Sequence, residues 1–139
     1  MIGRITDKNY PIQSCNDLYQ ISPSIEILQI DSDSCNDTPF YNLKLKDMPN
    51  LSLITIGDRC FSAVHFVQLS DLPSIKRLVI GNNSFYRPLT NEIVFKWDDC
   101  DSLTLQNCPQ LQVVEIGLLS FASYHFLIMD RLCNSFISK

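Results

Sequence analysis

The strongest constraint on this chain is a group of three sequence markers that recur together at one irregular spacing. Each group holds an Ile-Gly pair, a proline seven residues before that Ile and a phenylalanine five residues after it. From one group to the next, all three markers shift first by 24 residues and then by 36. Such shared spacing predicts structural repeats that stack on one another. The pairs are Ile56-Gly57, Ile80-Gly81 and Ile116-Gly117, the prolines are Pro49, Pro73 and Pro109, and the phenylalanines are Phe61, Phe85 and Phe121.

An earlier, less regular unit begins at Pro23, which lies 26 residues before Pro49. It has Asp31 where the others have Gly and Cys35 where they have Phe. Each unit is expected to contain two short strands, because apolar residues alternate with others along the first of them. We expect Gly to turn the chain after the first strand and the marker Phe to fill the core beyond the turn. First strands are expected at residues 25–30, 51–56, 75–80 and 111–116, with Leu28, Ile30, Ile54, Ile56, Leu78, Ile80, Val114 and Ile116 pointing inward.

The second strand of each unit is expected to end at the marker proline, because proline has no N–H to donate to a sheet. Asp47, Asp71 and Asn107 stand two residues before these prolines and suit a turn capped by a side chain. The second strands are expected at residues 43–45, 67–69, 103–105 and 127–129.

A unit of this size cannot bury its own apolar face, so the units must stack. The predicted fold is a mostly β solenoid of about four coils with a parallel β-sheet and little helix, in one domain spanning residues 1–139. Residues 1–22 form an irregular first coil or a cap, and residues 86–100 form an insertion in the third repeat. A terminal helix within residues 118–136 is the alternative to a last strand.

The stretch 73–85 carries the pattern L-x-x-L-x-L-x-x-N-x-L, with Ile75, Leu78, Ile80, Asn83 and Phe85 in its slots. The chain therefore resembles leucine-rich-repeat proteins over roughly residues 18–132. The form Ile-Gly-x-x-Cys/Ser-Phe, at residues 56–61 and 80–85, is similar to the irregular BspA-like branch of that family. The resemblance implies a curved solenoid whose parallel strands make a binding face, and a role in protein recognition that includes cell-surface adhesion.

Composition narrows the class of protein. The chain has 139 residues, of which 45% are hydrophobic and 19% charged, so it is expected to fold. Its net charge of -4 argues against nucleic acid as a partner, since phosphate-binding surfaces are usually basic. The sequence shows no signal-peptide core and no run of about 18 apolar residues, which predicts a cytoplasmic protein without a membrane partner.

No metal site or cofactor is predicted. The six cysteines include no C-x-x-C pair. Cys35, Cys60 and Cys108 fall on slots that are apolar or small in other repeats, which favours buried thiols over the alternatives of disulfides or metal binding. His65 and His125 each follow a marker Phe by four residues, and two coils would separate them by on the order of 10 Å, too far for one zinc ion.

The outward positions of the first strands are the candidate binding site. They read as two columns, and the first of these is unusually apolar for a solvated surface. A partly apolar surface rimmed by charge is typical of protein-binding sites, and Arg77 is expected to contribute most because arginine is enriched at such sites. Free drift of these positions explains the same residues equally well. The columns are Ile27, Leu53, Arg77 and Val113, and then Gln29, Thr55, Val79 and Glu115.

The insertion holds the only tryptophan of the chain. Ile93, Phe95 and Trp97 alternate as a strand with one apolar face would. Trp97 therefore either projects toward a partner or lies in a flap over the core.

These features favour a non-enzymatic protein-protein interaction module. One alternative is a solenoid carbohydrate-active enzyme that uses carboxylates such as Asp31, Asp33 and Asp58. Another is a structural fragment of a longer repeat array with no activity of its own. The expected partner is another protein, and apolar ends left uncapped would also permit end-to-end self-association.

Overall fold

The computed structural model describes residues 11–12, 15–18, 21–36, 41–86, 102–121, 124, 126–132 and 137–138. Trp97, His125 and the insertion beyond Tyr86 lie outside the described residues, so the predictions for them stay open.

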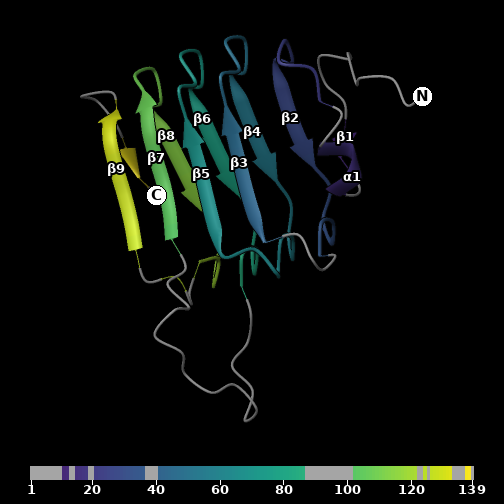
Figure 1. The fold of residues 1–139 in the computed structure, drawn as a ribbon. Coiled ribbons are helices and arrows are strands. Elements are labelled where there is room, and N and C mark those ends of the chain that lie inside the picture. Colours follow the sequence, from purple (N-terminus) through teal and green to yellow (C-terminus); the bar gives the residue numbers. More distant parts are fainter. Residues whose placement is uncertain are drawn as a thin grey trace.

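Almost all of the regular structure is parallel β-sheet (Figure 1). One helix, α1 (Cys15–Leu18), occurs in the described part, where no helix is long and apolar enough to cross a membrane. A six-stranded sheet has the order β1 (Pro11–Ile12), β2 (Ile27–Ile30), β4 (Leu53–Ile56), β6 (Arg77–Ile80), β8 (Val113–Ile116) and β10 (Ile137–Ser138). A four-stranded sheet has the order β3 (Asn42–Lys46), β5 (Phe66–Ser70), β7 (Ser102–Cys108) and β9 (Phe126–Leu132).

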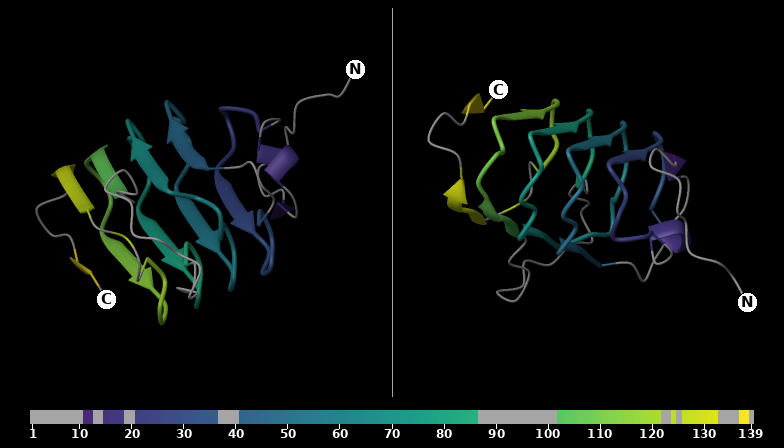
Figure 2. Two further views of the ribbon diagram at one scale, coloured as in Figure 1. Left: turned by 60° about the horizontal axis from the view of Figure 1, so that its bottom comes forward. Right: turned by 90° about the horizontal axis from the view of Figure 1, so that it is seen from above.

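From β2 to β10 the chain alternates between these two sheets, which Figure 2 shows as two facing layers. The ladder pairs residues at the spacing of the sequence repeats: Leu28 with Ile54, Ile54 with Leu78, and Leu78 with Val114. The predictions of a mostly β chain, a parallel sheet and little helix are confirmed. The alternative of a terminal helix is wrong for residues 126–132, because they pair with β7 as strand β9.

The predicted inward residues meet between the layers. Seven of the eight inward residues of the first strands are buried, and Ile116, on the last of them, is half-buried. The first strands begin two residues later than predicted. Ile25, Leu51 and Leu111 are buried but donate their N–H groups to the carbonyls of Ser22, Met48 and Cys108, and not within the six-stranded sheet.

The marker phenylalanines stack through the core. The rings of Phe61 and Phe85 lie 4.9 Å apart at an interplanar angle of 12°, and those of Phe85 and Phe121 lie 4.6 Å apart at 9°. Phe61 and Phe85 are fully buried, and Phe121 is half-buried. Tyr124 closes this column by meeting Phe121 edge-on at 4.9 Å. Aromatic stacking therefore joins three successive repeats.

The expectation that glycine turns the chain is wrong. No glycine in the described residues has a positive φ; the left-handed positions in these turns are Arg59, Asn83 and Leu119 and the marker phenylalanines. What the glycines supply is space. A Cβ on Gly81 would lie 2.8 Å from the carbonyl oxygen of Gly57, closer than real Cβ atoms approach backbone. Glycine is thus required by the contact between successive repeats and not by a backbone angle.

Candidate functional site

The predicted binding residues of the first strands lie side by side on the solvent side of the six-stranded sheet, which we call the outer face. Leu53 is in register with Ile27 and with Arg77, and Arg77 with Val113. The second column follows the same ladder, with Gln29, Thr55, Val79 and Glu115 in register. Eight of the nine predicted residues therefore come together, and Trp97 lies outside the described residues.

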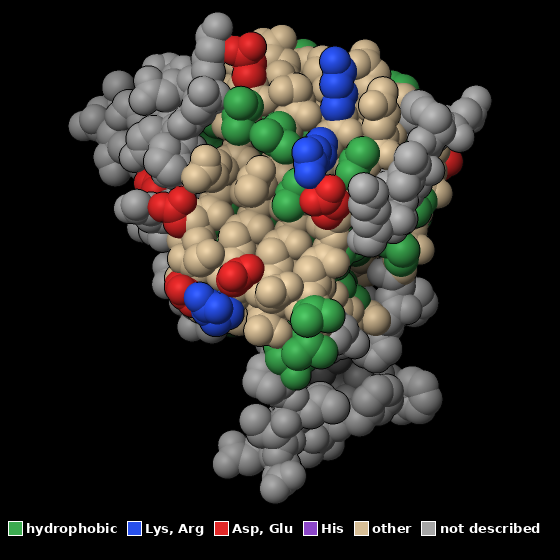
Figure 3. All heavy atoms as spheres, turned by 180° about the vertical axis from the view of Figure 1, so that it is seen from behind, with side chains coloured by type: hydrophobic (Ala, Val, Ile, Leu, Met, Phe, Trp, Pro, Cys, Tyr) green, Lys and Arg blue, Asp and Glu red, His purple; other side chains and the backbone are tan. Residues whose placement is uncertain are grey.

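The side chains of the outer face alternate along each strand with those that enter the core, and four of the eight are apolar. Ile27, Leu53, Val79 and Val113 are half-buried, packed against their neighbours yet reachable from solvent. Figure 3 views the molecule from this side and shows hydrophobic side chains beside charged ones of both signs. The apolar side chains of the outer face thus lie among polar and charged ones.

Arg77 is not an unpaired cation on this face. Its Nη2 atom donates a hydrogen bond to Oε1 of Glu115 at 2.9 Å. The two residues are diagonal neighbours, because Arg77 is in register with Val113 and Glu115 stands two residues further on. The pair crosses the outer face and neutralises its own charge there. Arg77, which was predicted to contribute most to binding, is therefore one half of an ion pair with Glu115.

A ladder of polar side chains lies next to the outer face, in the turns after the first strands. Ser32 Oγ accepts from the N–H of Asp58 at 2.9 Å, and Asp58 Oδ1 accepts from Asn82 at 2.8 Å. Asn82 Oδ1 in turn accepts from the N–H of Leu118 at 2.8 Å. Sequence reasoning missed this ladder, although its signal was a small acceptor in the second turn position of three successive units. Its side chains link successive repeats to one another.

A second ladder runs through a serine column inside the turns. Ser84 Oγ donates to the carbonyl of Gly57 at 2.7 Å and accepts from the N–H of Cys60 at 3.1 Å. Ser120 makes the same two contacts one repeat later, with Gly81 and Ser84. Cys60 stands in this column, and its thiol contacts the carbonyl of Asp31 at 3.1 Å. Cys60 thus takes the place of a serine in this network.

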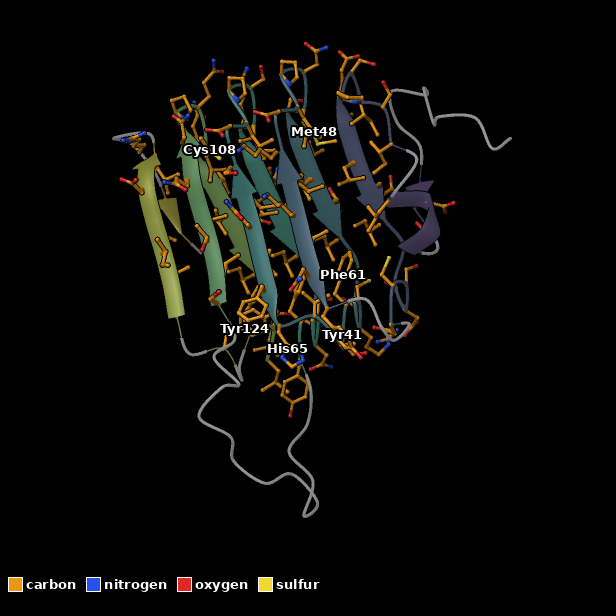
Figure 4. All side chains as sticks on the ribbon, in the orientation of Figure 1. Tyr41, Met48, Phe61, His65, Cys108 and Tyr124 are labelled. Carbon is orange, nitrogen blue, oxygen red and sulfur yellow. The ribbon has the colours of Figure 1, made fainter. Side chains whose placement is uncertain are left out.

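Cys35, Cys60 and Cys108 are free and buried, which confirms the prediction of buried thiols for these three. Burial raises the pKa of the Cys60 and Cys108 thiols above the ordinary value, which keeps them protonated at neutral pH. In Figure 4, Cys108 and Met48 both lie near the upper end of the four-stranded sheet. Both side chains lie in the hydrophobic core.

Two of the three carboxylates that the enzyme alternative would use, those of Asp33 and Asp58, contact other repeats. Asp33 binds the Arg59 guanidinium through both oxygens, at 2.6 and 3.0 Å, and this hydrogen bonding lowers the pKa of Asp33. Asp58 accepts from Asn82 in the polar ladder. Among the described residues, no group of three His, Cys, Asp or Glu side chains is placed to hold a metal ion.

The cavity between the sheets is a packing space. It measures about 10 Å³ and is lined by inward residues of both sheets, such as Leu28 and Leu45, and by the marker residue Phe85. Ligand pockets typically enclose about 300–1,000 Å³, so this cavity does not hold a substrate.

Sequence reasoning also missed an aromatic group at the start of β3 and β5. Figure 4 shows Tyr41 and His65 near each other at this end of the sheet. Their rings lie 5.9 Å apart, and the ring of Phe66 lies 6.3 Å from that of His65. Tyr41 and Phe66 are exposed. They lie at an end of the second sheet, away from the outer face.

Comparison with known proteins identifies no relative: no family model, no curated protein and no solved structure matches this chain.

Proposed function

We propose that this chain is a leucine-rich-repeat solenoid that acts as a protein-protein interaction module, with the outer face as its contact surface. Support for the repeat architecture comes from the register, because both sheets join residues at the spacing of the sequence repeats. The Ile-Gly pairs and the marker phenylalanines occupy corresponding positions in successive units, as a solenoid requires.

The observation that best supports this function is the partial exposure of apolar side chains on the outer face. Parallel sheets are almost always covered on both faces. Here the inner face is covered by the second sheet, while Ile27, Leu53, Val79 and Val113 on the outer face remain half-exposed in two adjacent columns. A protein partner that covers these columns would bury their apolar surface together with the Arg77–Glu115 pair that lies among them.

The Arg77–Glu115 ion pair places two opposite charges on the outer face. A partner that placed an apolar group over the pair would remove both charges from water at a cost in free energy. A partner with its own acceptor near Arg77 or donor near Glu115 would avoid that cost. The pair therefore selects among partners more than it adds affinity.

Affinity capture with matched variants tests this proposal. Val79→Asp and Leu53→Asp each put a carboxylate in the apolar columns. Thr104→Asp puts the same group on the half-buried outward position of β7, in the other sheet. We expect one protein to be captured by the unaltered chain and by Thr104→Asp, and lost with Val79→Asp and Leu53→Asp.

Circular dichroism and thermal unfolding must show that all four proteins remain folded. Equal capture by all of them would place the contact elsewhere. The absence of any protein enriched on the unaltered chain over Val79→Asp would also contradict the proposal. No observation of the structure favours a carbohydrate-active enzyme over this function.

A further inference from the structure

The two ends of the molecule differ in which segments cover or extend the sheets. At the N-terminal end, α1 and β1 lie beside β2 (Figures 1 and 2), and Leu18 and Ile21 pack against the core. At the C-terminal end, β10 pairs with β8 and extends the six-stranded sheet. In the four-stranded sheet, β9 is the last strand, and among the described residues it pairs only with β7.

The edge of β9 exposes side chains whose equivalents are buried one repeat earlier. Leu127 and Met129 are 60% and 40% exposed, while Leu103 and Leu105, their partners in register on β7, are 3% and 0% exposed. Ile128 between them is 50% exposed. Three consecutive apolar residues therefore meet solvent on a strand with an open edge.

The opposite edge of the same sheet is protected. Lys44 and Lys46 are exposed on β3, and lysine on an edge strand discourages pairing with another chain. Through the register of the four strands, Lys44 corresponds to Ile128 and Lys46 to Asp130. The edge of β9 thus has an apolar residue and an acid in the positions where the edge of β3 has lysines.

Asp130 has weak partners for a carboxylate. Its Oδ2 atom lies 3.4 Å from Gln106 Nε2 and 3.9 Å from Arg131 Nε, and its side chain is exposed. A cation in the same register on an added strand would lie directly opposite it. Opposite charges in that arrangement stabilise strand pairs.

We propose that the edge of β9 is a strand-addition site for an extended segment of another protein. The segment runs parallel to β9 and places apolar residues at two alternate positions, over Leu127 and Met129. It carries Lys or Arg opposite Asp130. This site is distinct from the outer face and does not rest on its function.

The chain itself contains a sequence that meets these requirements. In β3, Leu43 and Leu45 stand in register with Leu127 and Met129, and Lys46 with Asp130. Backbone hydrogen bonds to β9 give such a segment its affinity. Its alternate apolar side chains and the cation opposite Asp130 give the selectivity.

A labelled peptide with the sequence of residues 41–49 is the probe. Its fluorescence anisotropy is titrated with the full chain, and we expect saturable binding. Asp130→Lys should weaken the binding about fivefold, because it replaces an attractive cross-strand pair by a repulsive one. A peptide carrying Lys46→Glu should bind Asp130→Lys more tightly than it binds the unaltered chain.

Two controls separate strand addition from simple adhesion to an apolar end. A peptide N-methylated at alternate amides cannot pair its backbone and should not bind. Leu118→Ser removes a side chain that is 77% exposed in the turn after β8 and should leave binding unchanged. Absent binding of the first peptide, undiminished binding of the methylated one, or an equal loss with Leu118→Ser would overturn the proposal. Self-association of the chain in sedimentation that blocks the peptide would assign the edge to a second copy and overturn it too.

Discussion

The hydroxyl of Ser84 bridges two repeats, donating to the carbonyl of Gly57 at 2.7 Å and accepting from the N–H of Cys60 at 3.1 Å. Ser84 is fully buried, so water cannot replace either bond. The same column holds Ser120 one repeat later and Cys60 one repeat earlier. Contacts of this kind between repeats, more than contacts within one repeat, hold the turns together.

Ser84→Ala should destabilise the chain by about 1–3 kcal/mol, because it removes the hydrogen-bond partner of the Gly57 carbonyl and of the N–H of buried Cys60. Ser84→Cys is the matched control, since a thiol already fills this slot at Cys60, and its cost should be smaller. Urea unfolding monitored by circular dichroism measures both. Equal losses for the two variants would mean that packing, and not hydrogen bonding, selects serine here.

Phe85→Ala should destabilise the chain by about 3–5 kcal/mol, because it empties a buried site and removes the ring that contacts both Phe61 and Phe121. Phe66→Ala, at an exposed ring on β5, should cost well under half as much. The free energy of unfolding of the two variants decides this. A similar loss at both positions would contradict the role given to the aromatic stack.

Gly81→Ala should destabilise the chain by about 1–3 kcal/mol, because the new methyl group meets the backbone of Gly57. The sign of this change in stability separates two effects of the added methyl group. With φ negative at this position, alanine would otherwise stabilise the chain by reducing the entropy of its unfolded state. A raised midpoint of thermal unfolding would show that successive repeats are less tightly packed than the structure implies, with 2.8 Å between a Cβ on Gly81 and the carbonyl oxygen of Gly57.

Arg77→Glu should lower stability by about 0.2–1 kcal/mol, the range for an exposed ion pair, because it places two carboxylates together. The double variant Arg77→Glu with Glu115→Arg should recover most of this loss. The recovery should shrink in 1 M salt, where charges are screened over about 3 Å. A double-variant cycle in urea measures the coupling, and a zero coupling at low salt would show that the pair contributes nothing.

The ion pair of Asp33 with Arg59 should make stability depend on acid. The guanidinium lowers the pKa of Asp33 below its ordinary value of 3.8, so the folded chain holds that proton less tightly than the unfolded chain does. The stabilisation is therefore complete above 3.8 and disappears as the pH falls through the lower, folded-state pKa. Thermal midpoints between about pH 2 and pH 6 should fall less steeply for Asp33→Asn than for the unaltered chain. Parallel curves would show that Asp33 does not contribute.

Much of the β architecture could be predicted from the order of residues. The alternation in Leu28, Ile30, Ile54 and Ile56 has the period of a strand, and the shared spacing of the markers determines which residues align between repeats. Both signals are local or periodic, so they survive without knowledge of the fold. They placed the eight outward residues of the first strands in the columns that the ladder shows.

Only the tertiary structure determined which contacts these residues make and how exposed they are. Arg77 and Glu115 are 38 residues apart and meet only because the register makes them diagonal neighbours. Gly81 looked like a turn residue, but its requirement is set by the backbone of Gly57 in another repeat. Leu127 fits the same pattern as Leu103, yet it is exposed because no described strand follows β9. Periodicity determines which side of a strand a residue faces, while its exposure and its partners depend on which segments of the chain are packed against it.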